Sequence, residues 1–275
     1  MILVTGATGT IGRHLVRELT ERGTPFRALV RDRAKGEALG HPFAVGDFAD
    51  PASLAAALEG VDRLFLNGPG AQPVTGPQPM VAHQRAAIDA ARAAGVARIV
   101  KVSAWRPSPD SRLSVLAHHG IDRHLRAAGP AWATLRPTGF MQNLLAPAAF
   151  APDGALAGPY GTGRVAYVDA RDIAACAAVL LTGDEGLGRD HDLTGPEALT
   201  HAEIADLLGV PFRDVPPGEA GRDLRAAGLP AGFVDDLLWL YAEMADGSMS
   251  ETTTAVRDLT GREPYTFARF AADHR

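Results

Sequence analysis

The sequence contains a single cysteine among 275 residues, Cys176, so no internal disulfide can form. This scarcity is typical of proteins kept in a reducing compartment. No apolar run is long enough to cross a bilayer, and a glycine-rich turn beginning at Gly6 argues against a signal peptide. We therefore expect a cytoplasmic protein. Cys176 lies in an alanine-rich stretch, where it is either a reactive thiol or a small core residue.

An excess of positive charge is also absent. The chain has 27 lysines and arginines against 32 aspartates and glutamates, a net charge of −5, and its basic residues form no block. Nucleic acid and an anionic membrane are therefore disfavoured as partners. We expect a small-molecule substrate, no metal ion, and a monomer or homodimer. With 46% hydrophobic residues, the chain is long enough for one large α/β domain or for a domain with a smaller lobe.

The most informative stretch lies at the N-terminus. Residues 1–4 are all apolar, as in a strand buried on both faces of a parallel sheet, and residues 11–19 have apolar positions at helical spacing. Between them, Gly6, Gly9 and Gly12 follow the spacing G-x-x-G-x-x-G, which departs from the more familiar G-x-G-x-x-G. A strand-to-helix turn without side chains lets backbone N–H groups approach a pyrophosphate. The flanking elements favour a dinucleotide site over a merely tight turn.

Each residue of this turn has an expected role. Gly6 makes the turn, Gly9 admits the phosphates, and Gly12 lets the helix pack closely on the sheet. The neighbouring residues offer backbone or hydroxyl donors to the cofactor. These are Thr8, Thr10 and Ile11.

The end of the second predicted strand, residues 26–30, selects the cofactor. A carboxylate there binds the ribose 2′-hydroxyl of NAD, whereas a guanidinium pairs with the 2′-phosphate of NADP. Asp32 lies at the spacing that indicates NAD, but Arg31 is the first residue after the strand. We favour NADP(H), bound by Arg31, with solvated surface arginines as the alternative.

Two further strand ends are candidates for cofactor contacts. Asp47 follows a short strand within residues 41–47, where it either contacts adenine or simply ends the strand. Asn67 and Gly68 follow the strand at residues 61–66, where the crevice opens toward the second ribose. The glycine- and proline-rich segment that continues to residue 79 is either a mobile loop at the mouth of the site or a passive connector.

Strand and helix patterns alternate along the first half of the chain. This alternation predicts a Rossmann-type, right-handed, doubly wound parallel sheet in residues 1–150, completed by residues 164–195. A short helix is expected at residues 139–150. Residues 151–275 are expected to form mostly a small, mainly helical substrate lobe. Its apolar residues either line a pocket or form core: Phe233, Leu237, Leu238, Trp239 and Tyr241.

Several separated stretches together resemble the NmrA-like, atypical branch of the short-chain dehydrogenase/reductase superfamily. They are residues 4–12, 28–31, 102–104, 135–143, 167–174 and 193–200. The resemblance spans about residues 1–262 and implies a Rossmann domain that binds NAD(P)(H) and a small C-terminal substrate lobe. The branch includes quinone oxidoreductases, reductases of aromatic and polyketide ketones, and nucleotide-sensing regulators.

The resemblance also shows a departure at the catalytic position. Enzymes of the wider superfamily use a Tyr-x-x-x-Lys pair and a serine. Ser103 matches the serine, whereas Ser114 takes the tyrosine position and His118 the lysine position, and no tyrosine occurs before residue 150. His118 and His119 are the substitute acids, because an imidazole titrates near working pH; ribose contact or surface solvation are the alternatives. Ser103 either orients a substrate carbonyl or satisfies backbone groups.

The resemblance places other residues around the substrate. We expect Pro137 and Ser103 to contact the cofactor. Trp105, Phe140, Met141 and Asn143 are expected to contact the substrate. The sequence thus predicts an NADPH-dependent oxidoreductase that transfers hydride to a quinone, an enone, or an aromatic or polyketide ketone. An NADP(H)-binding redox sensor and a nucleotide-dependent isomerase or epimerase remain as alternatives.

Overall fold

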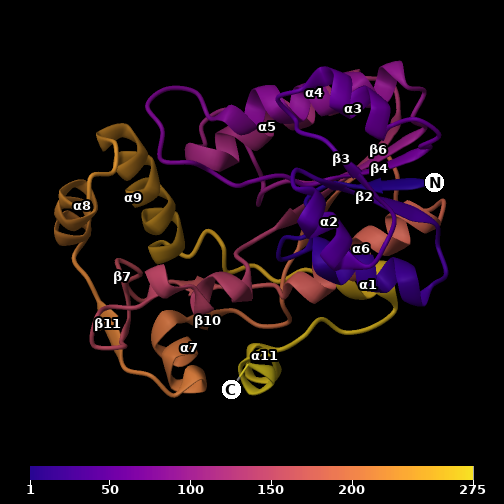
Figure 1. The fold of residues 1–275 in the computed structure, drawn as a ribbon. Coiled ribbons are helices and arrows are strands. Elements are labelled where there is room, and N and C mark those ends of the chain that lie inside the picture. Colours follow the sequence, from indigo (N-terminus) through magenta and orange to yellow (C-terminus); the bar gives the residue numbers. More distant parts are fainter. Residues whose placement is uncertain (275) are drawn as a thin grey trace.

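A seven-stranded parallel sheet forms the centre of the molecule (Figure 1). The computed structural model describes residues 1–274. The strand order is β3-β2-β1-β4-β5-β6-β9, and every neighbouring pair is parallel. The strands are β1 (Ile2–Val4), β2 (Phe26–Val30), β3 (Phe43–Val45), β4 (Arg63–Leu66), β5 (Arg98–Val102), β6 (Ala131–Pro137) and β9 (Arg189–Leu193). The order reverses between β1 and β4, which is where ligands bind in such sheets. The predicted fold class is confirmed.

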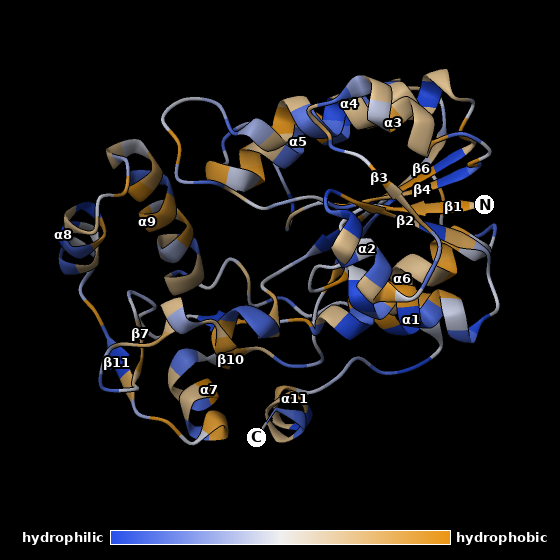
Figure 2. Cartoon of the chain, viewed as in Figure 1, coloured by the Kyte–Doolittle hydropathy of each residue, from blue (hydrophilic) through white to orange (hydrophobic). Residues whose placement is uncertain are grey.

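Helices cover both faces of the sheet (Figure 1). One face carries α1 (Gly12–Glu21), α6 (Ala170–Thr182) and α10 (Ala255–Thr260); the other carries α3 (Pro51–Ala57), α4 (Pro79–Ala93) and α5 (Leu113–Ala127). Alternate strand residues supply the two cores, because successive side chains point to opposite faces. Ile2 and Val4 pack in the first core and Leu3 in the second. Figure 2 shows the result as hydrophobic strands between helices whose hydrophobic and hydrophilic residues are interspersed.

The C-terminal lobe has its own hydrophobic cluster and lies beyond the carboxyl ends of the strands (Figure 1). Strand β7 (Leu156–Gly158) pairs in parallel with β11 (Phe212–Asp214), and β8 (Arg164–Val165) pairs antiparallel with β10 (Leu199–Thr200). The lobe helices are α7 (His201–Leu208), α8 (Pro217–Ala226), α9 (Ala231–Ala245) and α11 (Phe267–Asp273). Within residues 1–274, no helix is both long and apolar enough to cross a membrane.

Two local elements differ from the expectations. The helix expected at residues 139–150 is replaced by two short 3-10 helices, Met141–Leu145 and Pro147–Ala149. The reason is Pro147, because the residue before a proline avoids the helical conformation, and Ala146 accordingly has φ −69° and ψ 141°. A helix that was not predicted, α2 (Arg33–Leu39), begins directly after β2.

Cys176 is a core residue. It lies on α6 among buried alanines and is fully buried in the cluster between α6 and the sheet. Burial raises the pKa of its thiol to about 12, so the reactive thiolate is suppressed at neutral pH. Of the two alternatives for Cys176, the structure supports the small core residue.

Candidate active site

The turn between β1 and α1 is built from its three glycines. Gly6 has φ +63°, and a Cβ there would lie 3.0 Å from the carbonyl oxygen of Asn67. A Cβ on Gly12 would lie 2.0 Å from the carbonyl oxygen of Gly6, so α1 starts in direct contact with the turn. A Cβ on Gly9 would meet only the Gly6 oxygen, at 3.2 Å, among the residues that the structure describes. The absent side chain at Gly9 therefore leaves space outside the turn.

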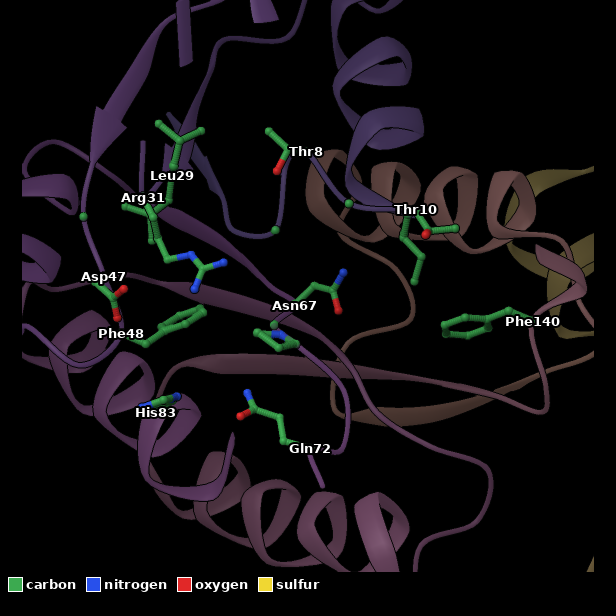
Figure 3. Close-up of a pocket in the computed structure, with 17 residues that line it drawn as sticks. Thr8, Thr10, Leu29, Arg31, Asp47, Phe48, Asn67, Gln72, His83 and Phe140 are labelled. Atoms are coloured by element: carbon green, nitrogen blue, oxygen red, sulfur yellow. The ribbon is translucent and has the colours of Figure 1, made fainter. Parts of the chain in front are cut away.

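A cavity of about 400 Å³ lies against this turn, at the carboxyl ends of β1, β2, β3 and β4 (Figure 3). We call it the glycine-turn cavity. Most of the residues expected to bind the cofactor line it: Gly6, Thr8, Gly9, Thr10, Ile11, Arg31, Asp47, Asn67 and Gly68. Gly12 is not among the lining residues, consistent with its packing role. The start of α1 provides the positive helix end that attracts a pyrophosphate.

The two candidate residues after β2 have different positions. Figure 3 shows the guanidinium of Arg31 directed into the glycine-turn cavity. Asp32 is instead the N-cap of α2, where its Oδ1 accepts a hydrogen bond of 2.7 Å from the backbone N–H of Ala34. Asp47 lines the cavity, but its Oδ1 also accepts a hydrogen bond of 2.8 Å from Ala49 N–H. Unlike Asp32 and Asp47, Arg31 has no hydrogen bond to a nearby backbone group among the described residues, and its side chain is available to a ligand in the cavity.

A second cavity, of about 410 Å³, adjoins the first, and we call it the His118 cavity. The two cavities share Thr10, Asn67, Gly68, Pro69 and Phe140, so they form one crevice along the sheet edge. Its other walls come from α4, the end of β5 and the segment after it, α5, the end of β6 and the segment after it, and α9. They include the predicted residues Ser103, Trp105, His118, Pro137 and Asn143.

A network of four polar side chains joins half-buried His118, at the wall of the cavity, to three buried residues behind it: Lys101, Ser103 and Asp122. Lys101 and Asp122 form an ion pair of 2.9 Å, with exposed fractions of 0% and 1%. The Lys101 Nζ lies 2.8 Å from Nδ1 of His118, and Ser103 Oγ donates a hydrogen bond of 2.6 Å to Oδ2 of Asp122. The geometry follows from periodicity, because residues two apart on β5 and four apart on α5 share a face. The network therefore ties the end of β5 to the middle of α5.

The network fixes the hydrogen-bonding state of His118. The Lys101 ammonium can only donate hydrogen bonds, because it has no lone pair to accept one. Burial lowers the pKa of Lys101, but the paired carboxylate of Asp122 stabilises the charged form. Nδ1 of His118 must therefore accept, which leaves the hydrogen on Nε2. Burial and the Lys101 charge hold the pKa of His118 well below its usual range. The expectation that His118 titrates near working pH is wrong: the ring is a neutral donor.

The comparisons with known proteins agree with the crevice. A family model described as NAD(P)H-binding matches residues 6–183. The chain belongs to this family. Within it, the chain is an NmrA-like, atypical member of the short-chain dehydrogenase/reductase superfamily, as the resemblance predicted.

Two relatives and one solved structure that match the whole chain are named as reductases or oxidoreductases. The chain is 39% identical to the NAD(P)H azoreductase of Xenophilus azovorans, covering 100% of this chain and 98% of that protein. It is 34% identical to a (4-alkanoyl-5-oxo-2,5-dihydrofuran-3-yl)methyl phosphate reductase of Streptomyces griseus, again over 100% and 98%. The solved NADPH complex of quinone oxidoreductase QOR2 from Escherichia coli superimposes with a TM-score of 0.85 at 28% identity, covering 100% and 99% of the two chains. These relatives confirm the prediction of an NAD(P)H-dependent reductase of the atypical short-chain type.

In this NmrA-like protein, the hydrogen bonds of Ser103 differ from two of its expected roles, the orientation of a substrate carbonyl and the satisfaction of backbone groups. Its one hydroxyl hydrogen is donated to Asp122, and its backbone N–H is bonded to the carbonyl oxygen of Leu135 at 2.7 Å. The hydroxyl therefore has no hydrogen left to donate to a substrate carbonyl, and it does not satisfy a strand-end backbone group. Ser103 holds the Asp122 carboxylate in place at the cavity wall.

Two other predictions are wrong. Met141 is only 1% exposed and packs in the lobe core, because the 3-10 turn directs it away from the crevice. His119 lies one position past His118 on α5 and so faces another direction; its Nδ1 is 3.3 Å from the carbonyl oxygen of Pro107. Neither residue lines the glycine-turn cavity or the His118 cavity. Met141 is therefore not a substrate contact, and His119 has no access to a reacting group.

Sequence reasoning missed three polar residues of the site and its network: Lys101, its partner Asp122, and Gln84. Lys101 lies between two valines in β5, whose other charged residue is Arg98 at its start, and a buried charge of this kind needs a partner. Gln84 lines the His118 cavity and is 2% exposed, yet its Oε1 has no hydrogen-bond partner within residues 1–274. That oxygen is an acceptor that a bound molecule can satisfy.

Proposed function

We propose that this protein is an NADPH-dependent reductase of small, conjugated acceptors of the quinone, azo or enone type. One observation carries the proposal: a single crevice leads from the glycine turn to His118, whose Nδ1 lies 2.8 Å from Lys101 Nζ. In our proposal the neutral imidazole offers its Nε2–H to a bound acceptor. Relatives named for azo and quinone reduction support the same class. The walls of the His118 cavity fit it as well, because they include the aromatic rings of Trp105 and Phe140.

The residues of the glycine-turn cavity fit a dinucleotide. The backbone around Gly6 and Gly9 and the first turn of α1 would hold the pyrophosphate, since no side chain fills that space. Arg31 would pair with the 2′-phosphate, which is the reason for preferring NADPH to NADH. The competing carboxylate, Asp32, is occupied as the cap of α2. The fit therefore supports NADPH as the working cofactor.

The protein residues have a defined task in the reaction. When bound, NADPH supplies the hydride, while water supplies the proton that completes reduction of a quinone to a hydroquinone and leaves NADP⁺. The Nε2–H of His118 donates a hydrogen bond to the acceptor atom that gains negative charge. Lys101 acts through His118 as a positioning residue, because its bond to Nδ1 keeps the hydrogen on Nε2. A tyrosine acid is not needed in this scheme, because the developing charge is held by hydrogen bonds.

Turnover tests the proposal. Purified protein is mixed with NADPH and, separately, with para-benzoquinone, azobenzene and a cyclic enone, and the loss of nicotinamide absorbance is followed over many turnovers. We expect at least one acceptor to be reduced, and the Gly9→Val variant to be inactive while remaining folded. If none of the three acceptors is reduced above the non-enzymatic rate, the proposed function is wrong.

A further inference from the structure

A third cavity, of about 460 Å³, lies between α9 and the segment that follows β5. Trp105 from that segment and Trp239 from α9 both line it, and we call it the tryptophan cavity. It shares four lining residues with the His118 cavity: Trp105, Val115, Leu240 and Met249. The two spaces are therefore neighbours, and a molecule bound beside His118 can extend from one into the other.

The size and walls of the tryptophan cavity suit an aromatic ring. An apolar cavity of about 150 Å³ is enough to bind benzene, so the volume here leaves room for a substituted ring. Tryptophan faces stack on aromatic rings, and the thioether of Met249 makes favourable contacts with ring edges. Trp105 is held in place, because its Nε1–H donates to the carbonyl oxygen of Ser248 at 3.3 Å.

The one arginine among the lining residues is already neutralised. The Arg106 side chain donates from Nε to Asp192 at 2.9 Å and from both terminal nitrogens to Glu251 at 2.7 Å. Its guanidinium also stacks on the Trp105 ring, 4.4 Å from the centroid. These bonds use three of the five guanidinium N–H donors, and the two carboxylates offset its positive charge, so the attraction of Arg106 for a sulfonate or phosphate on a ligand is weakened.

The remaining charged groups of the wall are acidic. Asp110 and Glu243 both line the tryptophan cavity. A negatively charged ring substituent would be repelled by these carboxylates, whereas a positively charged one would be attracted. The cavity thus has a charge preference as well as a shape.

The backbone at Arg106 is also unusual. Its φ of 37° lies in the left-handed region, which a residue with a side chain seldom occupies. Such strain persists where surrounding contacts determine the conformation, and it occurs often at ligand sites. Here the contacts are the two ion pairs and the stacking on Trp105.

We propose that the tryptophan cavity binds the second aromatic ring of a two-ring substrate whose conjugated acceptor bond lies beside His118. The ring it accepts is neutral or positively charged. This inference rests on the proposed reductase function and specifies its substrate class: extended diaryl acceptors, such as azobenzenes, in preference to single-ring quinones.

The first test compares a two-ring acceptor with a one-ring acceptor. KM and kcat are measured for azobenzene and para-benzoquinone with the wild-type protein, with Trp239→Ala and with Trp239→Phe. We expect Trp239→Ala to raise KM for azobenzene about tenfold, because the ring loses its apolar contact, and to leave KM for the quinone within about twofold. Trp239→Phe should recover much of the loss. Phe233→Ala is the matched control, since Phe233 lies on the same helix but does not line the cavity.

The second test concerns charge. Azobenzene is compared with its para-sulfonate and its para-trimethylammonium derivatives. The wild-type protein should have its highest KM for the sulfonate, and Glu243→Gln should reduce the difference between the two charged compounds several-fold. A wild-type protein that prefers the sulfonate would overturn the charge preference.

The outcomes separate this inference from the proposed function. If Trp239→Ala raises KM equally for azobenzene and for the quinone, or raises it for neither, the proposed role of the tryptophan cavity is wrong and the proposed reductase function still stands. If the wild-type protein reduces none of these acceptors, the proposed function fails. The proposal for the tryptophan cavity is then tested by binding alone. The dissociation constant for azobenzene is measured by spectral titration of NADP⁺-saturated protein. If this constant is the same in the wild-type protein and in Trp239→Ala, the proposal is overturned.

Discussion

Replacing Lys101 with methionine tests whether the hydrogen bond from Lys101 keeps His118 in its Nε2–H tautomer. The substitution keeps an unbranched chain as far as the ε position but removes the ammonium that lies 2.8 Å from Nδ1 of His118. A hydrogen bond from a charged donor contributes about 1.5–3 kcal/mol, which corresponds to a factor of about 10–150 in the ratio of the two imidazole tautomers. Without that bond the two tautomers should be populated about equally, so the Nε2–H fraction should fall to about one half and kcat should fall about twofold. KM should change little, because Lys101 does not line the His118 cavity.

The same substitution changes the response to pH. The Lys101 charge is one of the two causes that lower the pKa of His118, so the variant's pKa should rise toward the ordinary value. In the wild-type protein the imidazole stays neutral, and the contribution of His118 to kcat should not change between about pH 6 and pH 8. In Lys101→Met the imidazolium should form at a higher pH than in the wild-type protein, although burial still holds the pKa of His118 below its ordinary value, and kcat should then depend on pH. Nitrogen NMR of labelled histidine measures the tautomer and the pKa directly.

Stability needs a separate control, because Lys101→Met leaves Asp122 buried without its counter-ion. Breaking a buried pair costs about 3–5 kcal/mol of unfolding free energy. The double variant Lys101→Met/Asp122→Asn removes both charges, so it should regain much of that stability without restoring the donor to Nδ1. The reasoning is refuted if either variant keeps wild-type kcat and the Nε2–H tautomer.

Three other predictions follow from the structure. Gly9→Val should fold normally but show no NADPH binding in calorimetry. Gly12→Val should have a lower melting temperature, because its side chain would overlap the Gly6 carbonyl, and equal melting temperatures for the two variants would contradict this. Arg31→Ala should weaken the binding of NADPH much more than that of NADH. Arg33→Ala should leave the binding of both cofactors unchanged, because the Arg33 guanidinium lies over the Phe43 ring. Equal weakening of both cofactors by Arg31→Ala would remove the argument for NADPH. His201 is fully buried, and burial lowers its pKa to about 4, so the stability that neutral His201 contributes is present above about pH 6.5 and is lost as the pH falls toward about 4. In urea unfolding between about pH 7.5 and pH 5, the wild-type protein should therefore lose about 2 kcal/mol more unfolding free energy than His201→Gln. Equal losses of unfolding free energy in the two proteins would contradict this prediction.

The parts of the fold that could be predicted from sequence are those in which local patterns and tertiary structure agree. The strand at residues 26–30 was predicted to the residue, because a short apolar run ends at charged residues. The glycine turn was equally clear, since its strand and helix signals lie within a few residues. Asp32 shows the limit: the same residue satisfies a ribose-binding spacing and a helix N-cap, and only the coordinates show that it caps α2.

The candidate site was predicted less completely, because it depends on contacts between distant segments. His118 and Ser103 were identified, but the bonds that define their states come from Lys101 and Asp122. The lysine between two valines was the available signal, and the alternation of β5, continued by one residue past Val102, places it on the face of Ser103. Met141 was misassigned because the 3-10 geometry after β6, and hence its direction, depends on packing against the lobe.

A single-turnover experiment tests the central claim most directly. The protein, saturated with NADPH and freed of excess cofactor, is mixed in a stopped-flow instrument with one equivalent of azobenzene or para-benzoquinone. We predict that the nicotinamide absorbance disappears together with the acceptor and in equal amount, and that Gly9→Val shows no such phase. Bound nicotinamide that stays reduced in the presence of both acceptors would contradict the account.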